Sequence, residues 1–115
     1  MNVRNTRATI LHFGSDRAAL SLRSRNLKRS GYEVLNATDG FEALRCACLE
    51  VVDAVVLDQD GNSAEVEFVA AEIKRCRPQV PTIVLAKGAG PLRWTPQLAD
   101  ARVKTENVSL LFAAL

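Results

Sequence analysis

Asp58 is the residue whose type and position most strongly indicate chemistry. It follows Ala54-Val55-Val56-Leu57, a nearly continuous aliphatic run of the kind that forms a central parallel strand covered on both faces. Polar side chains at the carboxyl ends of such strands line the ligand crevice of open α/β sheets. The sequence therefore predicts that Asp58 belongs to a functional site. The structural alternative is a strand-terminal carboxylate that caps the next turn or pairs with Lys104.

Other residues of reactive type have simpler interpretations. Asp16 precedes a helical pattern, where an N-cap role explains it without a metal. His12 lies inside an apolar segment with no nucleophile nearby in a motif, so we expect a structural role. Cys46, Cys48 and Cys76 form an odd set without the spacing of a zinc site. Cys46 and Cys48 lie two apart on a predicted helix and point in different directions, so we expect small buried fillers rather than joint metal ligands.

The elements that must position these residues alternate regularly along the chain. Short apolar runs predict strands at residues 9–13, 32–35, 54–57, 82–85 and 101–104. Helical patterns cover residues 17–30, 41–49, 64–75 and 106–115. The stretch 87–96 holds Pro91 and Pro96, so a fourth helix there is short or irregular. This order predicts one flavodoxin-like α/β domain over residues 1–115, with a five-stranded parallel sheet between helices on both faces, a three-layer α/β/α arrangement.

Composition excludes several classes of protein. The 115 residues are 48% hydrophobic and 24% charged, which is ordinary for a globular domain and argues against disorder. No apolar run approaches the roughly 20 residues needed to cross a bilayer, and the cysteines suit a reducing cytoplasm, so we expect a cytoplasmic protein without a membrane partner. The net charge of +2 gives a weak nucleic-acid footprint. The basic stretch from Arg17 to Arg29 is interpreted as a solvated helix face, with docking of a partner as the alternative.

The segment Asp53-Ala54-Val55-Val56-Leu57-Asp58 resembles the third strand and phosphoacceptor of bacterial CheY-like response-regulator receiver domains. The rest of the chain falls into register around it, so the resemblance covers essentially the whole chain. The other matching pieces are Ile10-Leu11-His12-Phe13, Ser30-Gly31-Tyr32-Glu33-Val34, Asp39-Gly40-Phe41-Glu42-Ala43-Leu44 and the approach to the fourth strand from Arg77 to Leu85. Each piece is weak alone, but their order and spacing are fairly specific.

The resemblance implies a phosphorelay site. Asp58 would be the phosphoacceptor, and Lys104, at the end of the fifth strand, would be the cation that contacts the phosphoryl group. Receivers also hold Mg²⁺ beside the phosphoacceptor. Here the resemblance implies at most a weak site made from Asp16, Asp58 and the backbone carbonyl of Asp60.

The sequence departs from the receiver pattern at the metal and switch positions. Gly14 and Ser15 stand where receivers carry two acidic residues, which removes most of the oxygen ligands for Mg²⁺. Ala86 stands where receivers have the switch hydroxyl and has no hydroxyl to donate to a phosphoryl group. Asn62 and Thr105 replace two characteristic prolines. These losses affect switching and leave the fold intact.

Two functions follow from this pattern. The first is an atypical, non-enzymatic receiver that takes a phosphoryl group from a histidine kinase or phosphotransfer protein. The second is a pseudoreceiver that recognises another signalling protein without phosphorylation, and homodimerisation is open in both cases. A small flavodoxin-like enzyme or nucleotide binder is a third class, but Gly14-Ser15-Asp16 is not a G-x-G-x-x-G fingerprint. No helix-turn-helix module follows, so DNA binding by this domain alone is not expected.

Overall fold

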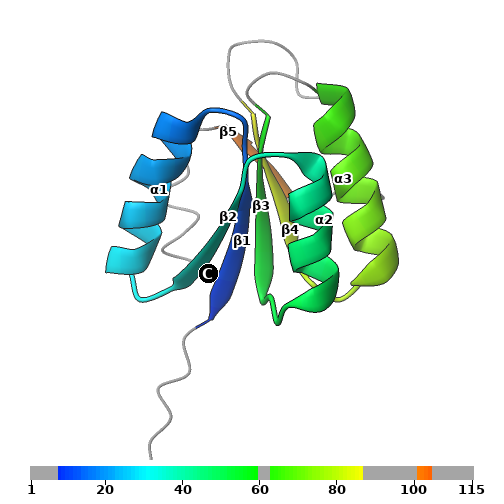
Figure 1. The fold of residues 1–115 in the computed structure, drawn as a ribbon, viewed down its shortest axis with the longest axis horizontal. Coiled ribbons are helices and arrows are strands. Elements are labelled where there is room, and N and C mark those ends of the chain that lie inside the picture. The colour runs from blue at the N-terminus through cyan, green and yellow to red at the C-terminus, as the bar shows by residue number, and fades with distance from the viewer. Residues whose placement is uncertain (1–7, 60–62, 87–100, 105–115) are drawn as a thin grey trace, which may run out of the picture.

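A computed structural model describes residues 8–59, 63–86 and 101–104 as a parallel sheet flanked by helices (Figure 1). The strands are β1 (Thr9–Phe13), β2 (Glu33–Ala37), β3 (Ala54–Gln59), β4 (Thr82–Ala86) and β5 (Ala101–Lys104). The helices are α1 (Arg17–Arg29), α2 (Gly40–Leu49) and α3 (Ser63–Cys76). The strand order is β2-β1-β3-β4-β5, and all four pairings are parallel. This confirms the predicted five-stranded flavodoxin-like sheet.

The sheet separates two apolar cores because successive strand residues point to opposite faces. Leu11, Val55 and Leu57 belong to the larger core, beneath α2 and α3. Ile10 and Val56 belong to the smaller core, beneath α1. Figure 1 shows the same layers, with α1 on one side of the sheet and α2 and α3 together on the other. The near-continuous apolar strands follow from burial on both faces.

Helix α1 begins and ends as its sequence predicts. The Oδ1 atom of Asp16 accepts hydrogen bonds from the backbone N–H groups of Ala18 and Ala19, each at 3.1 Å, which is an N-cap. After the helix, Gly31 has φ +98°, a left-handed conformation that costs glycine little. The helix therefore has a fixed length and phase, and its phase determines which of its side chains face the sheet.

Most predicted boundaries agree with the structure to within two residues, and β1 and β5 match throughout. Two predicted elements lie outside the described residues: the short or irregular helix at 87–96 and the final helix at 106–115. No helix in the part of the chain that the structure describes is long and apolar enough to cross a membrane.

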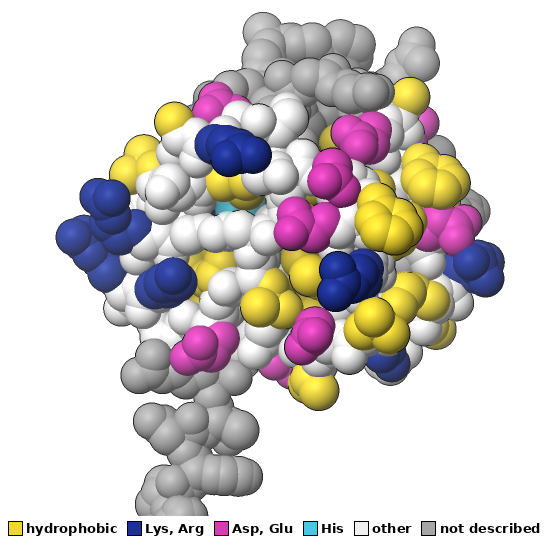
Figure 2. Space-filling view, viewed as in Figure 1, with side chains coloured by type: hydrophobic (Ala, Val, Ile, Leu, Met, Phe, Trp, Pro, Cys, Tyr) yellow, Lys and Arg dark blue, Asp and Glu magenta, His cyan; other side chains and the backbone are white. Residues whose placement is uncertain are grey.

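The two sides of the sheet expose different kinds of side chain. Arg17, Arg25, Lys28 and Arg29 are exposed on α1, whereas Phe41 and Phe68 are exposed on α2 and α3. Figure 2 shows dark blue side chains at the α1 side, and yellow side chains mixed with magenta and further dark blue ones over α2 and α3. The interpretation of α1 as a solvated basic face therefore holds for these four residues. It is wrong for Arg23, which turns inward.

Candidate functional site

Asp58 lies near the end of β3 and is almost completely buried, with 2% of its surface exposed. The two-residue period of the strand places it on the same face as Ala54 and Val56, which is the face that α1 covers. A carboxylate taken from water into such an environment is costly unless a cation and hydrogen bonds accompany it. The surroundings of Asp58 therefore determine what this site can do.

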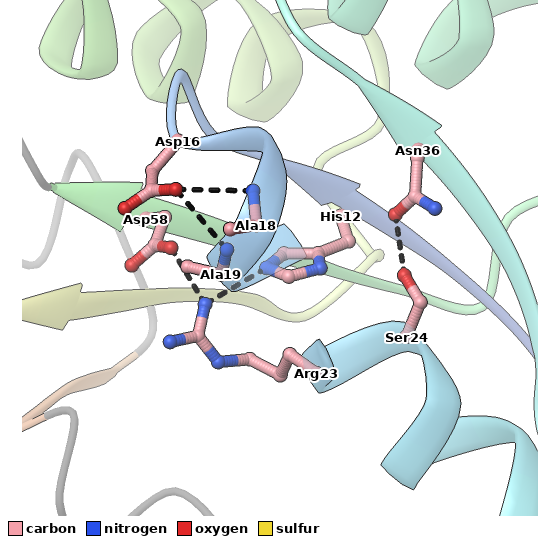
Figure 3. A network of polar contacts seen from close by, with 8 residues as sticks. All are labelled: His12, Asp16, Ala18, Ala19, Arg23, Ser24, Asn36 and Asp58. Carbon is pink, nitrogen blue, oxygen red and sulfur yellow. Dashed lines mark hydrogen bonds and ion pairs between the residues drawn. The ribbon is translucent and has the colours of Figure 1, made fainter. Parts of the chain in front are cut away.

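Arg23 of α1 supplies that cation. Its Nη1 atom lies 2.6 Å from Oδ2 of Asp58, and its side chain is only 11% exposed (Figure 3). Arg23 follows the buried Leu20 by three positions and precedes the buried Leu27 by four, so it belongs to the inner face of the helix. A charged hydrogen bond of this length in a buried place is among the strong ones.

His12 of β1 completes the network. It is fully buried, and its Nε2 atom lies 3.2 Å from the same Nη1 atom of Arg23. A guanidinium has donors only, so this contact is a hydrogen bond in the tautomer that leaves Nε2 without a proton. His12 thus helps to fix the guanidinium that contacts Asp58, and its expected structural role stays a prediction.

A second polar contact holds α1 in place next to this network. The hydroxyl of Ser24 donates to Oδ1 of Asn36 in β2 at 2.8 Å, and Ser24 is buried (Figure 3). Because Ser24 directly follows Arg23, this contact restrains the helix next to the residue whose guanidinium reaches Asp58.

Gly14 lies directly beside Asp58. A Cβ atom added to Gly14 would come within 2.9 Å of Cβ and 3.3 Å of Oδ2 of Asp58. A contact below 3.0 Å requires atoms to shift, so in this arrangement the position has no room for a side chain. The resemblance to receivers places a metal-binding carboxylate at this residue, and the structure instead has backbone in close contact with Asp58.

The described residues do not fit the Mg²⁺ that receivers hold. Mg²⁺ takes oxygen ligands in near-octahedral geometry. Oδ1 of Asp16 accepts from its own helix, and Oδ2 of Asp58 accepts from Arg23. Within the ranges described, no group of three or more His, Cys, Asp or Glu side chains is placed to hold a metal ion. The third suggested ligand, Asp60, lies outside the described residues.

Lys104 is the last residue of β5 and so lies, like Asp58, toward the carboxyl ends of the parallel strands. In the register of the strands it pairs with Ala86 of β4, which pairs with Gln59 of β3, the residue after Asp58. For Lys104 and Ala86 the structure describes the backbone only. Lys104 therefore lies two strands away from the end of β3, in agreement with its predicted place, and its role stays a prediction. Asn62 and Thr105 lie outside the described residues.

Comparisons with known proteins agree with this fold. No protein-family model matches the chain. The transcriptional regulatory protein PrrA of Mycobacterium tuberculosis is 35% identical over 81 residues, which cover 70% of this chain and 35% of PrrA. A response regulator of Burkholderia pseudomallei, solved with a phosphorylated aspartic acid, a calcium ion and citrate, has a TM-score of 0.78 at 25% identity, covering 94% of this chain and 66% of that one.

The response regulator TrrA of Thermotoga maritima, solved with Mg²⁺ and BeF, matches over its whole length. It has a TM-score of 0.77 at 25% identity, and the match covers 94% of this chain and 99% of TrrA. The chain therefore has the fold of CheY-like response-regulator receiver domains and is similar in sequence to response regulators. It spans about a third or less of the length of the curated relatives it matches.

Sequence reasoning missed one residue of this receiver site. Arg23 was grouped with the exposed basic residues of its helix, although its spacing from Leu20 and Leu27 places it on the inner face. That spacing could have predicted the inward position of Arg23. It could not have predicted that Arg23 contacts Asp58, because Asp58 lies 35 positions further along the chain.

Proposed function

We propose that this domain accepts a phosphoryl group on Asp58 from a histidine kinase or a phosphotransfer protein. The observation that carries the proposal is the buried Asp58 carboxylate near the carboxyl end of β3, with the Arg23 guanidinium 2.6 Å from it. Phosphoryl transfer depends mainly on positioning and on fixed positive charge near the transferred group. Asp58 and Arg23 provide a carboxylate nucleophile and one such charge.

The proposed transfer is a single displacement at phosphorus. A carboxylate oxygen of Asp58 forms a bond to phosphorus, while the bond from phosphorus to the histidine nitrogen of the donor breaks and its electron pair stays on that nitrogen. The product is an acyl phosphate. Arg23 stabilises the negative charge on the phosphoryl oxygens, and Lys104 adds a second cation if its role follows the family.

The wider setting is part of the same proposal. We infer that the domain is a substrate and relay of phosphoryl groups rather than an enzyme, and that it works in the cytoplasm as one unit over residues 1–115. The partner is a protein with a phosphorylated histidine or another signalling protein, with no nucleic-acid or membrane contact by this domain and with self-association open. The phosphorylated aspartic acid in the Burkholderia response regulator supports transfer to an aspartate in a related fold.

A second function is favoured by a specific contact. Arg23 engages Oδ2 of Asp58, and Gly14 removes a carboxylate from the metal position. A two-state switch needs different contacts in its two states. If Arg23 stays paired with Asp58, the domain has a single state. It would then be a pseudoreceiver, which recognises its partner in one conformation.

The intact mass of the protein after incubation with acetyl phosphate distinguishes the two functions. The experiment compares three proteins, each with Mg²⁺ and with a chelator: the wild type, Asp58→Ala and the control Asp53→Asn. Asn at position 53 keeps an acceptor for the Thr9 N–H that Asp53 now binds at 2.7 Å. A phosphoryl-sized mass gain that persists in Asp53→Asn and disappears in Asp58→Ala supports the receiver. No gain under conditions that label a control receiver overturns it and favours the pseudoreceiver.

A further inference from the structure

The cation next to Asp58 is part of the protein itself. Arg23 places Nη1 2.6 Å from Oδ2 of Asp58 and 3.2 Å from Nε2 of His12. Its side chain is 11% exposed, so the contact is not one of the loose surface ion pairs that contribute little. The buried Leu20, Ser24 and Leu27 fix the helix on either side of it.

A divalent cation at Asp58 would compete with this guanidinium. Mg²⁺ binds carboxylate oxygens at about 2.0–2.1 Å, so an ion on Oδ2 would lie only a few ångströms from Arg23. Two like charges that close, in a site largely shielded from water, repel each other strongly. Binding of the metal would therefore require the Arg23 side chain to leave its buried position.

Among the residues that the structure describes, the neighbours of Asp58 do not compensate for that repulsion. Gly14 offers no carboxylate and its backbone is in close contact with Asp58, and Oδ1 of Asp16 accepts from the backbone of α1. A metal would lose the ligands that receivers supply and would also meet a resident positive charge.

We infer that Arg23 is the resident cation of this site and excludes divalent metal ions from Asp58. The inference concerns the pairing of Arg23 with Asp58, and it holds whether or not Asp58 accepts a phosphoryl group. Its test therefore uses Mg²⁺ alone, without a phosphoryl donor, so that a failure here and a failure of the proposed function give different results.

The experiment is a Mg²⁺ titration of the full chain, followed by the backbone amide signals of Gly14 and Asp58 in two-dimensional NMR spectra. The variants are Arg23→Gln, the control Arg25→Gln on the exposed face of the same helix, and the double variant Arg23→Gln with Asp58→Asn. NMR spectra also show directly whether each variant is folded.

The wild type and Arg25→Gln are expected to show no saturable shift at millimolar Mg²⁺. Arg23→Gln is expected to gain a saturable shift at both amides, and the double variant to lose it. Saturable shifts at Asp58 in the wild type would overturn the inference, and this result needs no variant to fold. A folded Arg23→Gln protein that still ignores Mg²⁺ would also overturn it, because the missing ligands alone would then exclude the metal.

A separate pair of residues carries a second inference. The Sγ atoms of Cys48 and Cys76 lie 2.6 Å apart, although 28 positions separate the residues. Cys48 is near the end of α2 and is exposed, and Cys76 is the last residue of α3 and half-buried. The prediction that Cys48 is a buried filler is therefore wrong, whereas Cys46 is partly buried and packs against the larger core.

The ends of the two helices are held together by Arg77. Its Nε atom donates to the carbonyl of Ala47 at 3.1 Å, and its Nη2 atom donates to the carbonyl of Cys48 at 2.8 Å. These bonds satisfy carbonyl groups that the end of a helix leaves without partners within the helix. Since α2 and α3 pack side by side along their length (Figure 1), the two thiols are held near each other rather than meeting by chance.

We propose that Cys48 and Cys76 are an oxidisable pair that forms a disulfide between α2 and α3. With hydrogen peroxide as the oxidant, one thiolate attacks a peroxide oxygen, forms a sulfenic acid and releases hydroxide, which becomes water. The second thiol then attacks the sulfenic sulfur, forms the disulfide and releases another water. In total, two thiols are oxidised by two electrons and one peroxide is reduced to two water molecules.

The test counts free thiols by alkylation and intact mass after treatment with peroxide, with and without later reduction. The variants are Cys48→Ser, Cys76→Ser and the control Cys46→Ser. After oxidation, Cys46 should be the one thiol of the wild type that can still be alkylated. The Cys46→Ser variant should then have no free thiol. Later reduction should restore the free thiols in both proteins. Oxidation that stops at sulfinic acid, or that links two chains instead, would overturn the proposal.

Discussion

Nη1 of Arg23 lies 2.6 Å from Oδ2 of Asp58, so a helix residue forms an ion pair with the carboxylate near the carboxyl end of β3. The aspartate of this receiver is therefore paired within its own chain. The site has a positive charge at Arg23 beside the aspartate, and Gly14 stands where the resemblance to receivers places a carboxylate. Both features lower the negative charge available to a metal ion.

The contact at Gly14 predicts a cost for any added side chain. Gly14→Ala would bring a Cβ atom within 2.9 Å of the Asp58 Cβ atom, so atoms of β3 or of the loop after β1 must move. Overpacking of this kind costs about 1–3 kcal/mol in the free energy of unfolding, which urea denaturation measures. Ser21→Ala on the exposed face of α1 is the control and should change that free energy by less than about 0.5 kcal/mol. A Gly14→Ala protein as stable as the wild type would show that the close approach is absent.

The role of Asp16 as a helix cap predicts a stability effect without a metal effect. Asp16→Ala removes the acceptor for the Ala18 and Ala19 N–H groups and should cost about 1 kcal/mol. Asp16→Asn keeps an acceptor oxygen and should retain most of that stability. If the Asn variant loses as much as the Ala variant, or if Mg²⁺ stabilises only the protein with Asp at this position, the charge of Asp16 has another role.

Oxidation of the thiol pair should depend on pH. Burial and the hydrogen bond with Cys48 raise the pKa of the Cys76 thiol above its ordinary value. A raised pKa leaves less thiolate at neutral pH, and the thiolate is the reactive form. The rate at which peroxide consumes free thiols in Cys46→Ser should therefore rise steadily from neutral to alkaline pH. A rate independent of pH over that range would contradict this assignment.

The sequence was sufficient for the architecture because hydrophobic patterning and chain breakers determine it locally. The aliphatic run ending at Asp58 and the apolar segment around His12 predicted strands directly, and Asp16 indicated the start of α1. The register of β1 against β3 was not predicted, because both strands are apolar on both faces and their sequence therefore shows no alternation that would assign each residue to one side of the sheet.

The partner of Asp58 depended on information that no local pattern contains. Arg23 sits on the inner face of α1, where a long side chain commonly extends its charged end toward water. Whether it does so or meets a carboxylate depends on the position of α1 over β3, and hence on the packing of Leu20 and Leu27 against the sheet. The proximity of Cys48 and Cys76 likewise depends on how α2 packs against α3, which the sequence spacing of the two residues does not reveal.

The most direct test of the account is a double-mutant cycle on Arg23 and Asp58, measured by urea unfolding. Arg23→Met keeps an unbranched apolar stem and leaves the buried carboxylate without its partner, so it should cost about 3–5 kcal/mol. The double variant with Asp58→Ala should recover part of this loss. The account predicts a coupling energy of about 2 kcal/mol or more between the two residues. A coupling below about 0.5 kcal/mol, the scatter expected of independent sites, would contradict it.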